Sequence, residues 1–424
     1  MLSSMSLIYM GIYILTLLLA STEATSLSLA ALIGALLATF FGLTCNLFTP
    51  EEIIGFIDFR VILLLVGVMV TFEAVERSGL FRVLALYAIK YSRGDPRILF
   101  FSICFVSAAV SLFLTDVTAI LLVAAAAGTI ARIMDYDPVP YFVSAAIMIN
   151  LGGTSTLIGS TSNMIIGMAS GFSFIDFLNF LALCEIALWV LTALTLYFLY
   201  KPRLGERKIP PTYDPWGEIQ DRRIVYKAGF VIVFFLVLFL LYEKWNVGPE
   251  IIAFLCAILA LLIVDVDAGT VFRQIDWETI FFIGGFFIII GGLEKIGVLA
   301  AVSKAVLNLA HGNSFLAALL TLWSSALLSV FVSNIAVALT YAPIIGGMKS
   351  LNLNMDYLWS ALVLGTNLGG AATPVSGAVC VLAMGALKEE NVNLSFMEFS
   401  KAGTLTTIIQ LVFATFYLIL RFGV

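Results

Sequence analysis

Charged side chains are scarce in this chain of 424 residues. Only 12% of the residues are Asp, Glu, Lys or Arg, whereas 61% are hydrophobic. That much apolar surface exceeds what a water-soluble core can bury, so the composition excludes an ordinary soluble domain. The net charge of -5 provides no basic surface for nucleic acid. The first 59 residues contain no Lys or Arg. This argues against a signal peptide, and we expect the first apolar segment to stay as a helix.

Histidine and paired cysteines are also lacking. The only histidine, His311, lies in a polar turn, and the cysteines stand alone at positions 45, 104, 184, 256 and 380. This pattern argues against a disulfide framework, a thiolate metal cage and a bound metal cofactor, and predicts small buried thiols. HExxH, GxSxG and cofactor fingerprints are absent as well. We therefore expect no enzyme and no cofactor.

An internal repeat is present instead. Residues 57–177 resemble residues 275–399 at an offset of about 218, pairing Asp58 with Asp276, Glu76 with Glu294 and Gly79 with Gly297. At an offset of 217, Asn150, Gly152, Gly153 and Thr156 pair with Asn367, Gly369, Gly370 and Thr373. Repeats of this kind are typical of secondary transporters that bind solute between two halves.

Apolar periodicity predicts an all-α polytopic membrane protein. Each half has about five transmembrane helices, one of them broken. The expected spans are 7–20, 27–46, 58–76, 139–170 and 178–199, then 228–243, 249–265, 277–293, 356–388 and 399–422. Between the third and fourth spans, each half has an amphipathic segment, 79–91 or 296–310, and a helical hairpin, 98–131 or 314–347. Hairpin arms of about 15 residues reach about 22 Å, less than a bilayer core of about 30 Å, which favours re-entrant hairpins over full crossings.

An odd number of crossings gives the two halves opposite orientations, so we predict two inverted-topology repeats. They comprise residues 1–200 and 228–424 and are joined by the linker 201–227. The linker is rich in Lys, Arg and Pro, which predicts a cytoplasmic position in a multi-pass protein of the cell membrane.

Two polar, glycine-rich stretches interrupt the fourth and ninth spans: Asn150 to Asn163 and Thr366 to Ser376. Irregular backbone is tolerated at membrane depth only where protein or a watery cavity satisfies its polar groups. The glycines allow the helix to unwind, and exposed half-helix ends offer amides to anions and carbonyls to cations. Close helix packing by small residues is the alternative for either stretch alone.

The hairpin tips carry polar residues at equivalent positions, Thr115-Asp116 in the first half and Ser333-Asn334 in the second. A carboxylate within an apolar setting predicts exchange of a proton or competition between a proton and a cation. Helix capping by Thr115 or Asp116 is the alternative, and the two roles are compatible. Among the other acids, Glu73 and Glu185 could act as proton relays or lie at the membrane edge.

These motifs resemble the ion transporter superfamily, in particular arsenite efflux pumps, NhaD-type sodium/proton antiporters and P-protein permeases. GGTSTLIGSTSN, at 152–163, is similar to the family's GGTATLIGDPPN, and LTDVTAILL is similar to its hairpin tip LDNVTTVLL. NLGGAATPVSG resembles the NLGPKLTPIGS of arsenite pumps. The divalent anion:sodium symporters are more distant, because their tips read Ser-Asn-Thr.

The resemblance implies alternating access, often in a homodimer, and a set of residues that line substrate and ion sites. Together with the interruptions, it indicates Thr115, Asp116, Thr118, Asn150, Gly153, Thr154, Ser155, Thr156, Ser160, Asn163, Ser333, Asn334, Asn367, Gly370, Thr373 and Ser376. No metal site is expected beyond a sodium ion near Asp116 and Asn334. Ser160-Thr161-Ser162 replaces the family's Asp-Pro-Pro, so one acidic position is missing.

We therefore expect a secondary active transporter embedded in the lipid bilayer. The first choice is proton-coupled efflux of a small inorganic solute such as arsenite or antimonite, because hydroxyls and amides suit neutral As(OH)3. A cytoplasmic ATPase would be a further partner of an arsenite pump. The alternatives are a sodium/proton antiporter, with H+ or Na+ as coupling ion, and a sodium- or proton-coupled anion transporter. A subunit of a proton-pumping assembly is disfavoured because Lys304 and Lys349 lie near segment ends.

Overall fold

The computed structural model describes residues 4–21, 25–114, 119–120, 123, 134, 136–207, 216–217, 221–349, 353–374, 378–389 and 394–422. Within these ranges the secondary structure is entirely helical, as predicted. The helices of the first half are α1 (Ser4–Ser21), α2 (Leu27–Thr44), α3 (Pro50–Gly55), α4 (Phe59–Glu76), α5 (Leu80–Ser92), α6 (Pro96–Ser111), α8 (Val139–Gly152), α9 (Thr161–Ser170) and α10 (Phe174–Tyr200).

After the short 3-10 helix Lys201–Arg203, the second half follows the same order. Its helices are α11 (Arg222–Leu241), α12 (Pro249–Val264), α13 (Ala268–Gln274), α14 (Trp277–Lys295), α15 (Val298–Leu309), α16 (Ser314–Ser329), α17 (Asn334–Gly346), α18 (Met355–Gly369), α19 (Ala378–Glu389) and α20 (Phe396–Phe422). A 3-10 turn, Tyr242–Trp245, extends α11. The short helices α3 and α13 were not predicted, because six or seven residues are too few to show a helical period.

Six described helices are long and apolar enough to cross a bilayer unaided: α1, α2, α10, α11, α14 and α20. Many of their side chains face outward; Leu36 and Leu183 are 69% and 71% exposed, which only a lipid environment accommodates without cost. The ten expected crossings also include α4, the 16-residue α12 and the two interrupted spans, α8 with α9 and α18 with α19. Ten crossings therefore remain a prediction.

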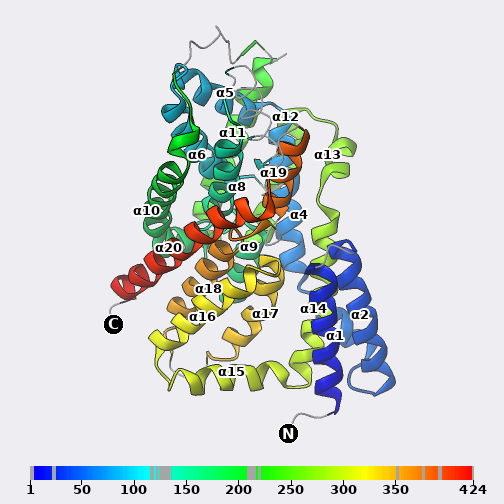
Figure 1. Cartoon of the computed structure of the whole chain (residues 1–424). Helices are drawn as coiled ribbons and strands as arrows, with labels where there is room; N and C mark the ends of the chain where they lie inside the picture. Colours follow the sequence, from blue (N-terminus) through cyan, green and yellow to red (C-terminus); the bar gives the residue numbers. More distant parts are fainter. Residues whose placement is uncertain are drawn as a thin grey trace.

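The repeat in sequence is reproduced by local geometry. Asp58 and Asp276 cap the N-termini of α4 and α14, and Gly79 and Gly297 have φ angles of 79° and 83° before α5 and α15. Positive φ is favourable mainly for glycine, which explains why both copies carry it. Figure 1 shows α5 at one end of the molecule and its counterpart α15 at the other.

The two halves pack against each other through reciprocal helix crossings, α2 on α14 and α4 on α12. A Cβ atom added to Gly285 would lie 2.9 Å from the backbone of Ala31, and one added to Gly67 would lie 2.6 Å from the backbone of Ala253. Gly67 and Gly285 are equivalent in the repeat. Each crossing therefore depends on the absence of one side chain.

We expect Gly285→Ala to destabilise the protein by about 1–3 kcal/mol, the usual cost of overpacking, because backbone atoms cannot yield to the added methyl group. Gly284→Ala is the matched control in the same helix, since its Cβ would meet nothing within 4 Å. Thermal unfolding in detergent measures the difference. Equal melting temperatures for the two variants would show that the crossing is not tight.

The hairpin helices are short. α16 has 16 residues and α17 has 13, so they extend about 24 Å and 20 Å and fall short of a bilayer core of about 30 Å. These lengths agree with re-entrant hairpins. The α15–α16 pair is bent by 119°, so the amphipathic α15 runs across the end of the molecule and not along the hairpin.

Candidate functional site

Both predicted interruptions are present. α8 ends at Gly152 and α9 begins at Thr161, while α18 ends at Gly369 and α19 begins at Ala378. The residues between α8 and α9, 153–160, are all buried although they form no helix. Buried irregular backbone needs internal hydrogen-bond partners, so other groups of the protein must satisfy the polar backbone atoms of this segment.

The first interruption comprises residues 153–160, and the side chain of Asn163 supplies hydrogen bonds to its carbonyl oxygens. Nδ2 of Asn163 donates to the carbonyl oxygens of Gly153, Thr154 and Thr156 at 2.8, 3.2 and 2.9 Å. Asn163 is fully buried in the first turn of α9. Its backbone N–H donates to the hydroxyl of the N-cap residue Ser160 at 3.2 Å. One side chain thus closes the unwound segment into a ring.

Asn367 connects this ring to the second half of the chain. Its Nδ2 donates to Oδ1 of Asn163 at 2.8 Å and to the Val363 carbonyl at 2.8 Å. Only 2% of Asn367 is exposed. Residues 204 positions apart in sequence, both predicted to line the site, are therefore in direct contact.

The symmetric contact in the second half uses a cysteine. Asn150 is equivalent to Asn367, and its Nδ2 donates to Sγ of Cys380 at 3.6 Å. Cys380 occupies the position equivalent to Asn163, and its Sγ lies 3.9 Å from the Gly370 carbonyl. This contact differs from its counterpart in the first half, because sulfur is the weaker hydrogen-bond partner. Sequence analysis missed Cys380 as a site residue, although the offset of 217 from Asn163 was a usable signal.

Hydroxyl groups fasten the interrupted helices to the hairpins at paired positions. Ser111 donates to the Ile149 carbonyl at 2.6 Å, and Ser329 donates to the Thr366 carbonyl at 2.8 Å. Thr156 and Thr373 reach carbonyls of Leu112 and Val330 at 3.5 and 3.1 Å. Thr156 and Thr373 therefore contact the hairpins in this conformation.

Other predicted residues have local partners. The Thr154 hydroxyl donates to the Leu151 carbonyl at 2.7 Å, and the Ser160 and Ser162 hydroxyls are 2.8 Å apart. Ser333 accepts from the Ile335 amide at 3.3 Å as N-cap of α17. Asn334 is half-buried in the first turn of α17, and within the described residues its side chain makes no hydrogen bond. Among the described residues of the predicted set, its side chain is a candidate contact for a ligand.

Four predicted residues, Thr115, Asp116, Thr118 and Ser376, lie outside the described residues. The sodium site near Asp116 and Asn334 therefore stays a prediction. Among the described residues no group of three or more His, Cys, Asp or Glu side chains could hold a metal ion.

The two other buried acids have distinct surroundings. Glu73 forms an ion pair with Arg77 one turn away, at 2.9 Å near the end of α4. Glu185, on α10, is 1% exposed and accepts from the Ser155 backbone amide at 2.6 Å and from Trp189 Nε1 at 3.0 Å. Glu185 thus contacts the first interruption directly. Sequence reasoning ranked it low because 30 positions separate it from Ser155.

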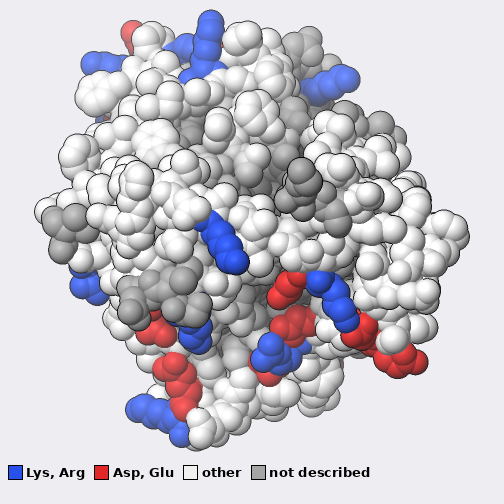
Figure 2. All heavy atoms as spheres, turned by 90° about the horizontal axis from the view of Figure 1, so that it is seen from below, with Lys and Arg blue, Asp and Glu red and all other residues white. Residues whose placement is uncertain are grey.

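The described residues line two cavities, and one of them lies beside the interrupted helices. A polar one of about 320 Å³ is lined by α9 and α10 on one side and α17 and α18 on the other, and includes Asp176, Lys349 and Asp356. Figure 2 shows the face at the α15 end: it is mostly uncharged, with acidic and basic side chains mixed on one side. The cavity lies at the ends of α17 and α18 that are remote from Asn334 and Gly369.

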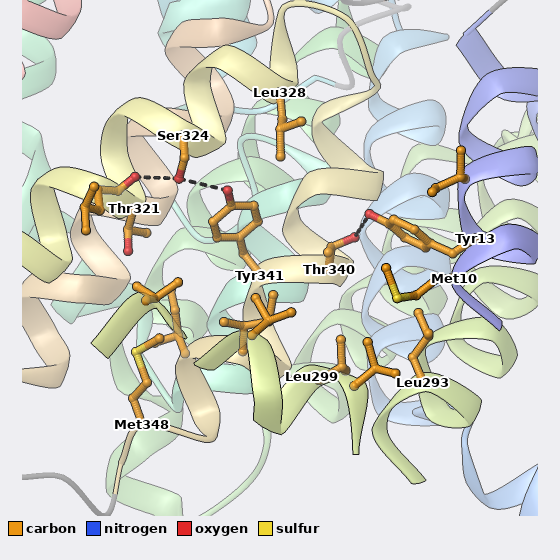
Figure 3. A pocket seen from close by; sticks show the side chains of 17 residues that line it. Met10, Tyr13, Leu293, Leu299, Thr321, Ser324, Leu328, Thr340, Tyr341 and Met348 are labelled. Carbon is orange, nitrogen blue, oxygen red and sulfur yellow. Dashed lines mark hydrogen bonds between the residues drawn. The ribbon is translucent and has the colours of Figure 1, made fainter. Parts of the chain in front are cut away.

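The second cavity, of about 300 Å³, is apolar and lies between α1, the α14–α15 corner and the α16–α17 hairpin. Figure 3 shows its two hydroxyl pairs: Tyr341 donates to Ser324 at 2.8 Å, and Tyr13 lies 2.9 Å from the Thr340 hydroxyl. Its walls are otherwise aliphatic, so it does not suit a small polar solute.

The sequence matches the profile of a known family over residues 17–365; the family is CitMHS, described as citrate transporter. The chain is 29% identical to a 46 kDa membrane protein of Mycobacterium leprae, and the alignment covers 99% of both chains. It is 28% identical to the uncharacterized transporter Rv2684 of Mycobacterium tuberculosis, again over 99% of both chains.

The fold resembles that of the YdaH transporter from Alcanivorax borkumensis, whose crystal structure was described as having an unusual topology. The TM-score is 0.66 at 16% identity, covering 100% of this chain and 99% of that one. This likeness concerns the fold alone. Together with the membrane-spanning helices and the profile match, the comparisons establish that the chain belongs to the CitMHS family of multi-pass membrane transporters.

Proposed function

We propose that this protein is a secondary active transporter that exports a small, neutral, oxygen-bearing solute of the arsenite or antimonite type in exchange for protons. The observation that supports it best is the buried contact between Asn163 and Asn367, which brings two interrupted helices together at one point. Around that point lie backbone carbonyls, amide groups and hydroxyls. Such groups can exchange hydrogen bonds with As(OH)3.

The lack of cationic side chains in the interrupted segments favours a neutral solute over an anion. Residues 150–163 and 366–374 include no Lys, Arg, His, Asp or Glu. A multiply charged anion would need a cationic partner to offset the loss of hydration, and the described part of these segments offers none. Asn334, half-buried and without a hydrogen bond in the described residues, would be the first side chain to reach the solute.

The proposal includes alternating access between two inverted repeats. The crossings of α2 with α14 and of α4 with α12 would form a fixed frame, because glycines hold these helices backbone to backbone. The hairpin α16–α17 with α18, and α6 with α8, would move as a unit, since Ser329 and Ser111 fasten each hairpin to its interrupted helix. We further propose a cell-membrane location with the linker 201–227 in the cytoplasm.

A carboxylate anion is the second candidate. The matching profile is that of a citrate transporter family. In addition, Ser160 caps the N-terminus of α9 at the end of the first interruption. The free amides and the dipole of a helix N-terminus favour anions. A coupled cation would then have to supply the missing positive charge.

Reconstitution in liposomes with a trapped pH dye tests these candidates. We expect arsenite and antimonite to move protons, and sodium, lithium and citrate to have no effect. A response to sodium would replace the proposal by sodium/proton antiport, and a response to citrate would replace it by anion symport. Absence of any response would contradict proton-coupled transport. Asp116→Asn is expected to abolish the proton flux while leaving the melting temperature unchanged.

A further inference from the structure

Glu185 is a carboxyl group in the interior of a membrane-spanning helix, and among the described residues it has no cationic partner. It is the twelfth of the 27 residues of α10 and is 1% exposed. Its oxygens accept from the Ser155 amide at 2.6 Å and from the Trp189 indole at 3.0 Å. A buried carboxylate without an opposite charge is costly and marks a functional position.

The helices packed against α10 bring no cation to this position. α8 contains no charged residue, and its one titratable group, Tyr141, lies in its first turn. The charged residues of α6, α11 and α20 lie in their end turns: Arg97, then Arg222, Arg223 and Lys227, then Glu398, Lys401 and Arg421. The remaining titratable groups on these helices and on α10 itself are the neutral side chains Cys104, Cys184, Tyr197, Tyr200, Tyr226 and Tyr417, together with Asp176 in the first turn of α10. The 3-10 helix that follows the far end of α10 adds Lys201 and Arg203. Within the described residues, backbone N–H groups, the Trp189 indole and the Ser155 side chain compensate the charge.

The contact with Ser155 ties Glu185 to the interruption that Asn163 closes. Ser155 lies between Thr154 and Thr156, and the carbonyls of both neighbours accept from Asn163. A hydrogen bond from an amide to an ionised carboxylate is roughly twice as strong as one to a neutral acid. Gain of a proton by Glu185 therefore loosens the segment that Asn163 holds, and loss of the proton tightens it.

We propose that Glu185 is the positioning residue through which a proton controls the first interrupted helix. One proton from the aqueous side adds to the carboxylate, and the same proton leaves when the segment closes again. This deepens the proposed function, on which its role in transport rests, by placing a proton site in the first half in addition to the hairpin tip.

Hydrogen exchange of segment 153–160 tests this without transport. In the wild type, we expect the protection factors of these backbone amides, corrected for the intrinsic exchange rate, to fall roughly tenfold from alkaline to acid pH. The reason is that the hydrogen bond from the Ser155 amide to the ionised Glu185 is lost. Glu185→Gln keeps an acceptor for Ser155 but cannot ionise, so its protection should not change with pH. Glu278→Gln is the matched control, since Glu278 also accepts from a backbone amide, that of Leu27 at 2.8 Å, far from the interruption. It should retain the wild-type pH profile.

Transport by the same variants gives a separate result. In arsenite exchange at equal pH on both sides, Glu185→Gln should stay within about twofold of the wild type, whereas uptake driven by a pH gradient should fall at least roughly tenfold. A wild-type pH dependence of protection in Glu185→Gln would overturn the inference. Failure of arsenite to move through the wild type would instead contradict the proposed function and leave the hydrogen-exchange result standing.

Discussion

Asn163→Ala is expected to destabilise the protein by about 3 kcal/mol or more and to abolish transport. The substitution leaves three buried carbonyl oxygens, those of Gly153, Thr154 and Thr156, without their donor. It also removes the acceptor of Asn367. Each buried polar group left unpaired costs about 1–3 kcal/mol, and partial relaxation of the segment recovers only some of the sum. Melting temperature in detergent and solute uptake in liposomes are the measurements.

Cys380→Ala is the matched control, because Cys380 occupies the equivalent position in the second half. Its contacts with Asn150 and Gly370, at 3.6 and 3.9 Å, involve sulfur and are weak. We expect it to lower the melting temperature much less than Asn163→Ala. Asn163→Asp keeps the shape but replaces the donor by acceptors that face three carbonyls, so it should be as damaging as alanine. Similar melting temperatures for Asn163→Ala and Cys380→Ala would contradict the greater stabilisation that we expect from the amide contacts of Asn163.

Gly152→Ala and Gly369→Ala are expected to destabilise the protein by about 1–3 kcal/mol each and to reduce transport strongly. The added Cβ would lie 2.3 Å from the carbonyl oxygen of Ala108 in the first case and 2.3 Å from that of Ala326 in the second. Both are backbone atoms within hairpin helices, so the hairpin itself must shift. Because each hairpin contacts the interrupted helix just before its break, the shift would displace the site.

Gly229→Ala serves as the control for both variants. Gly229 lies within α11, and its added Cβ would meet nothing within 4 Å. Replacing a helical glycine with alanine at an open position is expected to raise stability by about 0.5–1 kcal/mol, so this variant should melt at or slightly above the wild-type temperature. Wild-type transport and melting in Gly152→Ala would show that the hairpin can move away from α8 without loss.

The large features of the fold were predicted from local signals. Apolar runs located the helices, and the glycine doublets located both interruptions. The interruptions were predicted to begin at Asn150 and Thr366, whereas α8 and α18 continue to Gly152 and Gly369. Boundaries were less accurate: α11 begins at Arg222 and not near residue 228, since Asp221 caps its first turn. The five cysteines were predicted to be buried, and four are, but Cys45 is exposed just after α2.

The site was predicted as a set of residues but not as an arrangement. The sequence identified Asn163 and Asn367 separately, and nothing in their local patterns indicated that they contact each other. Thr156 and Thr373 were predicted to line the site, and the structure shows that their hydroxyls reach hairpin carbonyls. Glu185 gained its importance only from the contact with Ser155.

The sequence by itself determined that this is a duplicated, membrane-embedded helical protein with an unwound segment in each half. Hydropathy, helix breaking and repetition depend on neighbouring residues along the chain, so they can be read without coordinates. Only the tertiary structure decided which buried donor meets which carbonyl, and that Cys380 contacts Asn150. Such pairings join residues tens to hundreds of positions apart in the sequence. They also depend on how closely the helices pack, and this distance is controlled by Gly67, Gly152, Gly285 and Gly369.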